Sequence, residues 1–170
     1  MRSRARIGGH SIHPMLVVFP LGLLGTAVIF DILYLITDRT GYQIAAAYTI
    51  AAGIIGGLVA AVFGVADLSG VPAGSRAKRV GVVHGALNVL SLALFAASWL
   101  QRVGAGNWKP HAGALICSFA GIVVAAVSGW LGGELVERYG LGVREDANVD
   151  APGAVSRKPS RAENQRFANR

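Results

Sequence analysis

The sequence predicts an all-α protein in which four helices cross a lipid bilayer. Apolar residues make up 53% of the chain and charged residues only 15%, whereas about a quarter of a soluble domain is charged. Four apolar runs, at 15–36, 44–66, 80–100 and 112–134, are each about 20 residues long, enough to cross a hydrocarbon core about 30 Å thick. A soluble bundle would need a polar face along each helix, and most of their length offers none.

The residues before and after the first two apolar runs indicate where the helices begin and end. Residues 1–12 form a basic lead-in to the first span. Pro14 disfavours helical geometry in the residue before it, which predicts that His13 stands just outside the first helix. The loop at 37–43 is short, as expected between antiparallel neighbours, and the loop at 68–79 is longer and contains Gly and Pro breakers.

The second half of the chain is organised similarly, although no clear sequence repeat relates the two halves. Loop 101–111 ends in WKPH, where the Pro marks the next helix start. The transmembrane domain is therefore expected at 13–140. Residues 141–170 are rich in charged and small polar residues and are expected to form a flexible, disordered tail. Small residues recur in the second and fourth runs, which indicates close helix–helix packing, within the bundle or in a dimer.

Basic residues predict the orientation. Thirteen of the 16 Lys and Arg residues lie in the N-terminus, the second loop and the C-terminal region, and three lie on the other side. The three are Arg39, Arg102 and Lys109. Since Lys and Arg are retained in the cytoplasm, both termini are expected there. The residue pattern thus predicts a multi-pass protein with the N-in/C-in arrangement.

The formal net charge of +7 is explained by the basic loops that membrane proteins retain on the cytoplasmic side. The basic residues are dispersed, and no aromatic residues are interleaved with them to stack on bases, so nucleic acid is not an expected partner. Anionic lipid headgroups are the expected partners of the basic tail, and the bilayer surrounds the spans.

Five polar residues are expected at one membrane face. Adjacent spans run in opposite directions, so the starts of the first and third spans meet the ends of the second and fourth. These places hold His13, His84, Asn88, Asp67 and Glu134. His84 and Asn88 are spaced i, i+4 and therefore share one face of the third helix. Polar groups within a span are functional candidates because they are expensive in lipid.

Three roles for this cluster stay open. His13 and His84 are candidate axial ligands of a b-type haem, with Asp67, Asn88 and Glu134 orienting the imidazoles. The same two histidines with the carboxylates are instead a candidate site for a divalent metal such as Zn, Fe or Mn. The third role is a hydrogen-bonded network that only locks helix packing.

Three further polar or aromatic residues stand apart from the cluster. Asp31 lies near the other face, where it is expected to be an interfacial acid exposed to water, with His111 as a candidate partner. His10 and His13 form an HxxH motif, which is a weak signal because Pro14, directly after His13, opposes the helical pairing that would place both on one face. Trp130 lies one turn before Glu134 near the interface.

Four motifs are similar to those of a known family. The spans contain HPMLVVFP, FGVADL, GVVHGALNVL and SGWLGGELVERYGLGV, in that order. Over residues 10–144 the chain resembles the family of domain of unknown function 2231, bacterial four-helix integral membrane proteins. The matching residues are His13, Pro14, Pro20, Asp31, Asp67, His84, Asn88, Trp130, Gly132, Gly133 and Glu134. Some relatives join this domain to Rieske-type or cytochrome-like modules, which implies electron transfer with a redox partner protein.

The specific hypothesis is a non-enzymatic, redox-associated subunit of the bacterial cytoplasmic membrane. No Ser has a recognisable nucleophile setting and Cys117 lies mid-span, so covalent catalysis has little support. The alternative is a structural or partner-binding membrane protein, working with another protein or as a homo-oligomer.

Overall fold

The computed structural model describes residues 4–144, 147–149 and 151, so most of the predicted tail at 141–170 lies outside the described residues. The elements, in order, are β1 (Arg6–Ile7), β2 (His10–Ser11), α1 (Ile12–Leu16), α2 (Val18–Thr37), α3 (Thr40–Ser69), α4 (Arg76–Arg102), the short 3-10 helix η1 (Gly106–Trp108) and α5 (Ala112–Glu137). The two strands form a small antiparallel ribbon before the first helix.

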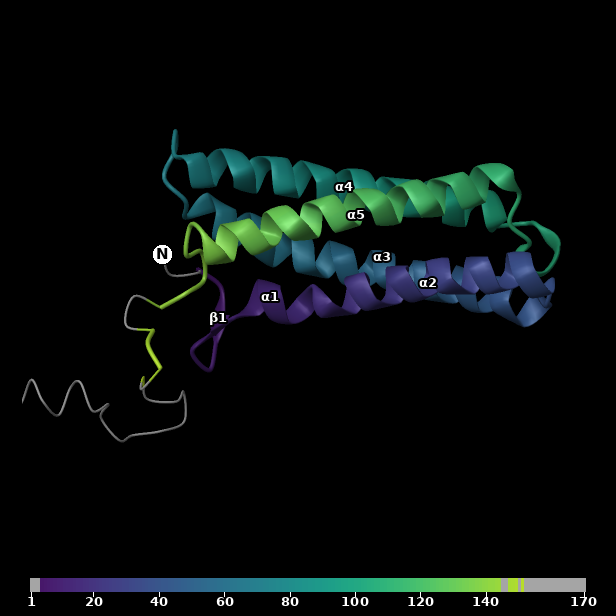
Figure 1. Cartoon of the computed structure of the whole chain (residues 1–170), viewed down its shortest axis with the longest axis horizontal. Coiled ribbons are helices and arrows are strands. Elements are labelled where there is room, and N and C mark those ends of the chain that lie inside the picture. The colour runs from purple at the N-terminus through teal and green to yellow at the C-terminus, as the bar shows by residue number, and fades with distance from the viewer. Residues whose placement is uncertain (1–3, 145–146, 150, 152–170) are drawn as a thin grey trace, which may run out of the picture.

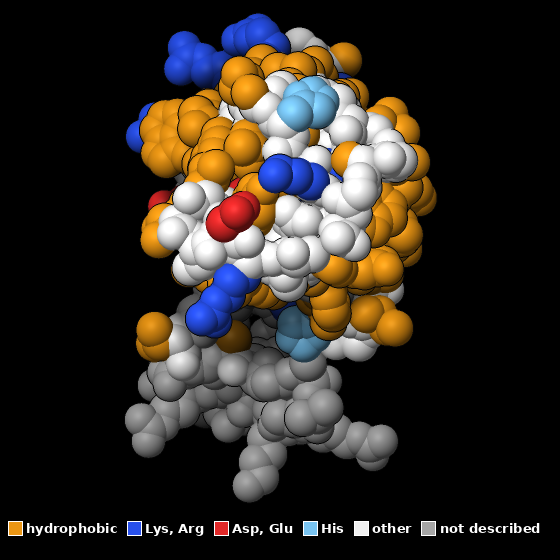
Figure 2. All heavy atoms as spheres, turned by 90° about the vertical axis from the view of Figure 1, so that its right-hand side faces the viewer, with side chains coloured by type: hydrophobic (Ala, Val, Ile, Leu, Met, Phe, Trp, Pro, Cys, Tyr) orange, Lys and Arg blue, Asp and Glu red, His pale blue; other side chains and the backbone are white. Residues whose placement is uncertain are grey.

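The four predicted spans are confirmed. Four helical stretches, with α1 and α2 counted together, are long and apolar enough to cross a membrane. Large apolar side chains on every one of them point outward, among them Ile29, Ile55, Val89 and Ile116. Figure 2, a view along the bundle, shows hydrophobic side chains around its flank. A water-soluble protein does not present so much contiguous apolar surface, and the protein is a multi-pass membrane protein.

The helices extend beyond the predicted apolar runs by up to about one turn, because capped polar turns continue them past the hydrocarbon core. The side chain of Ser75 accepts a hydrogen bond from the backbone N–H of Lys78 at the start of α4. His111 caps α5 in the same way, with its Nδ1 accepting from the N–H of Gly113. After α2, Asp38 takes a left-handed conformation and a two-residue link leads into α3.

His13 lies inside α1, so the expectation that it stands outside the helix is wrong. Pro14 is in the first turn, where a backbone N–H has no intrahelical acceptor, and it therefore costs no hydrogen bond. The break between α1 and α2 falls at Val17 instead. Pro20 explains it, because a proline has no N–H to donate to the carbonyl four residues earlier, that of Leu16.

The helices form two antiparallel hairpins that pack side by side (Figure 1). In the first, α1 and α2 pack against α3, and in the second α4 packs against α5. We call the end where α1 begins and α5 ends the terminal face, and the end with the links at 38–39 and 103–111 the distal face. The buried apolar core lies between the hairpins and consists of Leu24, Ala27, Val28, Ile50 and Phe95.

The second hairpin repeats the first, contrary to the expectation that the halves are unrelated. On the first helix of each hairpin, equivalent positions are 71 residues apart, as for Asp31 and Arg102. Identical residues at this offset are His13, Leu16, Val18, Leu21 and Leu23, which recur as His84, Leu87, Val89, Leu92 and Leu94. On the second helix the offset is 68, and Ala46, Ala52, Gly53, Ile54, Val59 and Gly64 recur as Ala114, Ala120, Gly121, Ile122, Val127 and Gly132.

Equivalent contacts support the repeat. A Cβ on Gly53 would lie 2.6 Å from the side chain of Leu24, and a Cβ on Gly121 would lie 2.9 Å from the ring of Phe95. Both glycines thus let the first helix of their own hairpin approach closely. These small residues serve packing within the bundle, as expected for helices in lipid.

Asp31 and Arg102 form a bidentate ion pair inside the bundle. Nη1 donates to Oδ1 and Nη2 to Oδ2, both at 2.7 Å, and both side chains are 0% exposed. Nη2 also donates to the hydroxyls of Ser98 and Ser118, at 3.2 and 3.1 Å. Ser98 in turn donates to the carbonyl of Ala114 at 2.7 Å. The network therefore ties α2 to both helices of the second hairpin.

The ion pair corrects two expectations. Asp31 is not a water-exposed acid, and its partner is Arg102 rather than His111, whose ring caps α5. Arg102 is likewise not a loop cation. It is the last residue of α4, so its positive charge is neutralised by Asp31 instead of marking a side of the membrane. In the sequence alone, a basic residue at the end of an apolar run looks the same whether it lies in a loop or is buried in an ion pair.

Removing one charge of this pair should destabilise the protein more than removing both. Arg102→Met leaves a buried carboxylate without its partner, which costs about 3–5 kcal/mol, whereas Asp31→Leu with Arg102→Met removes both charges and should restore most of the loss. Unfolding in mixed detergent micelles, followed by circular dichroism, measures this. Arg138→Met, which breaks an exposed pair, is the control and should cost less than about 1 kcal/mol. A double variant as unstable as the single one would contradict the prediction.

Candidate functional site: two histidines at the terminal face

His13 is held against α3 by a backbone hydrogen bond. Its Nδ1 lies 2.8 Å from the carbonyl oxygen of Ala60. A Cβ on Gly64, one turn further along α3, would lie 2.9 Å from Cε1 of the imidazole. The glycine therefore lets the ring lie flat against the helix, and the carbonyl sets the position of Nδ1.

His84 makes the equivalent contacts in the second hairpin and adds others. Its Nδ1 lies 2.8 Å from the carbonyl oxygen of Ser128 and 3.0 Å from the Ser128 hydroxyl. A Cβ on Gly132 would lie 3.1 Å from Cε1 of the ring. Nε2 lies 3.0 Å from the amide nitrogen of Asn88, which also donates to the backbone carbonyl of His84. Both ring nitrogens are thus engaged.

The backbone contacts determine which nitrogen carries the proton. A carbonyl oxygen only accepts, so Nδ1 of each imidazole is the N–H donor, and Nε2 carries the lone pair in the neutral ring. Asn88 donates its amide N–H to that lone pair in His84. An Nδ1–H held by a carbonyl is the arrangement that orients a histidine whose Nε2 binds a metal.

Asp67 fixes the N-terminal segment. Its Oδ1 accepts hydrogen bonds from the backbone N–H groups of Arg4 and Ala5, at 3.0 and 3.2 Å. The guanidinium of Arg4 donates to the hydroxyl of Ser69 at the end of α3. The carboxylate thus connects the start of the chain to α3 close to the position of His13. Its Oδ1 is occupied by these two hydrogen bonds from backbone N–H groups.

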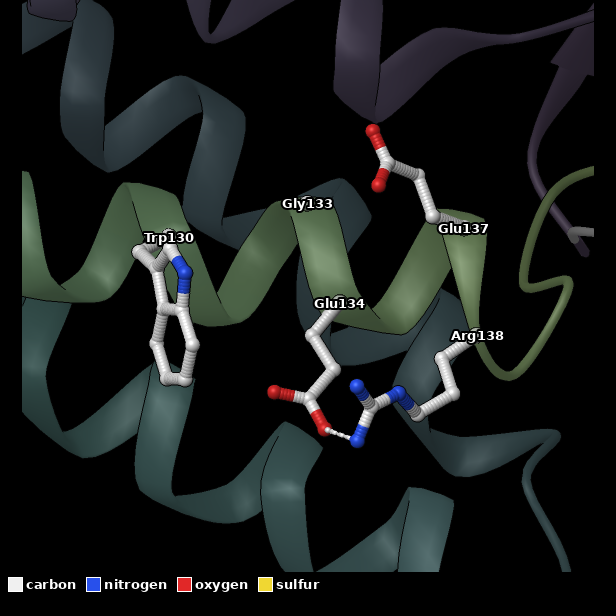
Figure 3. A pocket seen from close by; sticks show the side chains of 5 residues that line it. All are labelled: Trp130, Gly133, Glu134, Glu137 and Arg138. Atoms are coloured by element: carbon white, nitrogen blue, oxygen red, sulfur yellow. Dashed lines mark ion pairs between the residues drawn. The ribbon is translucent and has the colours of Figure 1, made fainter.

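Glu134 lies in a shallow hollow on the outside of α5. It forms an i, i+4 ion pair with Arg138 at 3.3 Å, in which the Arg138 side chain is 74% exposed. Trp130, Gly133 and Glu137 complete the hollow, whose volume is about 430 Å³. Figure 3 shows Trp130 and Glu134 on one side of the helix, with Glu137 pointing the other way. Trp130 is 69% exposed, as suits an aromatic side chain at a membrane interface.

The five predicted site residues therefore divide into separate contacts, and Asn88 lies midway along α4 (Arg76–Arg102) rather than at its end. His84 and Asn88 are hydrogen-bonded to each other, whereas Asp67 contacts the N-terminal segment and Glu134 pairs with Arg138. His10 belongs to the ribbon, where its Nδ1 lies 3.1 Å from the carbonyl of Gly8. Within the described residues no three His, Cys, Asp or Glu side chains are grouped so that they would hold a metal ion.

Two contributors to the site were not predicted, the carbonyls of Ala60 and Ser128. They are backbone groups, for which the side-chain pattern carries no signal. The recurrence of a glycine four residues after each of them, Gly64 and Gly132, is the feature that would have pointed to both.

Comparison with known families agrees with this architecture. The family described as "Predicted membrane protein (DUF2231)" matches residues 9–145. The chain belongs to the DUF2231 family. This confirms the resemblance, and the matched region extends from the N-terminal ribbon through all four spans of this DUF2231 protein. No curated protein and no solved structure matches the chain.

Alanine at Gly132 should destabilise the DUF2231 protein, whereas alanine at Gly133 should not. The ring of His84 cannot retreat from a new Cβ, because Ser128 holds Nδ1 and Asn88 holds Nε2. Overpacking of this kind costs about 1–3 kcal/mol. A Cβ on Gly133 meets nothing within 4 Å. The unfolding midpoints of both variants in detergent test this, and equal midpoints would show that the ring is free to move.

Proposed function

We propose that this protein is a non-enzymatic, haem-binding membrane subunit in which His13 and His84 are the axial ligands. The observation that carries the proposal is the repeated imidazole unit, in which each Nδ1 is fixed by a backbone carbonyl at 2.8 Å. Each ring is thereby oriented with Nε2 as its lone-pair nitrogen. A haem held by two imidazoles supplies one-electron transfer.

The donor set favours haem over a divalent metal. A protein-bound Zn²⁺ takes three or four protein ligands, and the described residues bring no three suitable side chains together. A haem would need only two imidazoles from the protein, which His13 and His84 would supply. Gly64 and Gly132 lie against the two imidazoles, so each glycine makes room for the histidine ring itself.

Asn88 determines how accessible His84 is as a ligand. Its amide donates to Nε2 in this structure, so ligation requires the amide to rotate away and leave its hydrogen bond to the backbone carbonyl of His84. For the His13 side chain, the only hydrogen bond that the described residues provide is at Nδ1. Nε2 of His13 would therefore bind a ligand without first losing a hydrogen bond to the described residues.

Absorption spectra of the four single histidine variants test the proposal. The wild-type protein, purified after expression with ample haem supply, should show a sharp band on dithionite reduction. His13→Ala and His84→Ala should each lose that band, because two axial ligands are required. His10→Ala and His111→Ala are matched controls that should retain it, since one ring lies in the ribbon and the other caps α5. A wild-type protein without the band would exclude haem ligation.

The alternative function is a structural or partner-binding subunit, and one observation favours it. Every buried side-chain nitrogen and oxygen atom in the described residues has a hydrogen-bond partner. A fully satisfied polar network of this kind specifies helix register without any ligand. Under this alternative, His84→Ala destabilises the bundle because it removes the ring that Ser128 and Asn88 contact, and no variant changes a spectrum.

The proposed location is the bacterial cytoplasmic membrane, with both termini in the cytoplasm. The basic residues support it: with Arg102 neutralised inside the bundle, only Arg39 and Lys109 remain at the distal face. The same proposal includes a redox partner protein, a homo-oligomeric state and attraction of the basic tail to anionic lipids.

Labelling of introduced cysteines tests the orientation. In a Cys117→Ala background, the Ala73→Cys and Val103→Cys variants place a thiol in the exposed link after α3 and just after α4. A membrane-impermeant maleimide added to intact spheroplasts should label Val103→Cys and spare Ala73→Cys, because basic loops stay in the cytoplasm. Inside-out vesicles should give the opposite pattern. Reversed labelling in the two preparations would overturn the N-in/C-in arrangement.

A further inference from the structure

Two of the five glycines in α5 have no packing role within the described bundle. A Cβ on Gly113, Gly121 or Gly132 would lie within 3.1 Å of a side-chain atom, so each of these three lets another side chain approach. A Cβ on Gly129 or Gly133 would meet nothing within 4 Å, and both residues are exposed. Because they are four residues apart, they lie on the same side of the helix. Close packing inside the chain does not explain this pair.

The first hairpin provides an internal comparison for these positions. At the offset of 68 residues, Gly133 corresponds to Val65 of α3 and Trp130 corresponds to Val62. Both valines are 67% exposed, as suits apolar side chains surrounded by acyl chains. Contact with lipid therefore requires neither a glycine nor a large aromatic side chain here, and α5 differs from α3 on its outward side.

The hollow on the outside of α5 lies over this glycine pair. Trp130 and Glu134 lie on one side of it and Glu137 on the other, with Gly133 between them (Figure 3). Its volume is about 430 Å³. All of its described lining residues belong to α5, so the hollow faces away from the bundle. A second helix that crosses α5 at the glycines would fill it.

The charged groups at the hollow are complementary to those of a second copy of the chain. Glu137 is exposed and has no ion-pair partner among the described residues. Arg138 donates from Nη1 to Glu134 at 3.3 Å, and its side chain is 74% exposed. A guanidinium has five N–H donors, so Arg138 can bind a second carboxylate without releasing the first. Glu137 of the partner subunit would supply that carboxylate.

Membrane insertion places the two copies in register. Copies that insert in the same orientation have parallel α5 helices, so a twofold axis along the membrane normal brings equivalent residues to the same depth. Glycines at the spacing of Gly129 and Gly133 allow two membrane helices to cross with their backbones close together. An acyl chain in the hollow would fill the space but would leave Glu137 without a partner.

We propose that the outward side of α5 is the interface of a parallel homodimer. Gly129 and Gly133 form the crossing point, Trp130 packs against the partner helix, and Arg138 of each copy pairs with Glu137 of the partner subunit. The inference rests on the homo-oligomeric state of the proposed function and is independent of haem, because none of these residues is hydrogen-bonded to either imidazole in the described structure.

Energy transfer between labelled copies of the full-length protein tests the interface. In vesicles of phosphatidylethanolamine and phosphatidylglycerol, the wild type should show a signal that rises with the protein-to-lipid ratio and saturates. Gly129→Ala with Gly133→Val gives α5 the residues of α3 at these positions and should weaken dimerisation by about tenfold or more. Gly22→Val is the matched control and should leave dimerisation unchanged, because Gly22 is an exposed glycine of α2 whose Cβ also would meet nothing within 4 Å.

Cysteine cross-linking tests which side of the bundle forms the dimer. In a Cys117→Ala background, Ala126→Cys places a thiol one turn before Trp130 on the exposed side of α5. Leu58→Cys is the matched control, because it occupies the equivalent, exposed position of α3. Oxidation in the same vesicles should give a disulfide-linked dimer of the Ala126→Cys variant and little of the Leu58→Cys variant.

Three results would overturn the proposal. A wild type that stays monomeric at every protein-to-lipid ratio would leave the hollow to lipid. A double glycine variant that dimerises like the wild type would place the interface elsewhere, and equal cross-linking at both positions would indicate random collisions. Unfolding midpoints separate loss of the dimer from loss of folding, and the cross-linking decides if the double variant does not fold. Neither measurement depends on a haem band, so the two proposals fail separately.

Discussion

The buried ion pair between Asp31 and Arg102 is the constraint on which the rest of the bundle depends. Two charges without any exposure in an apolar interior are tolerated only with close geometry and further hydrogen bonds. The bidentate contact and the hydroxyls of Ser98 and Ser118 provide both. Because α2, α4 and α5 all contribute, a shift of any one along its axis would expose a charge to lipid. The pair thus fixes the register of one hairpin against the other near the distal face.

The repeat explains why the position of the ion pair holds two different residues, whereas the position of the histidines holds the same residue in both hairpins. Asp31 and Arg102 are equivalent in the two hairpins and contact each other, so two identical charges there would repel. Each imidazole instead binds a carbonyl of its own hairpin. A contact inside a hairpin works equally well in both copies, and His13 and His84 remain the same residue. Contacts between the hairpins require complementary residues.

The sequence predicts the number of helices, their order and the face to which the polar residues belong, because bilayer thickness and the apolar runs determine these. It does not predict the rotation of each helix about its axis, which decides what Asp67 and Glu134 contact. It also misplaces Arg102, since a cation at the end of a span normally reaches water. The repeat is hidden because the identities are sparse and the offset changes from 71 to 68 between the helices of a hairpin.

The surroundings of His13 and His84 differ at two positions. Ser128 stands where the first hairpin has Ala60, and Asn88 stands where it has Val17. These two polar additions clamp His84 at both ring nitrogens, whereas His13 has one carbonyl contact. The chain has one imidazole that is rigidly held and one whose Nε2 meets no hydrogen-bonding group of the described residues. Nε2 of His84 can therefore act as a ligand only if Asn88 moves, whereas no hydrogen bond of the described residues opposes ligation at Nε2 of His13.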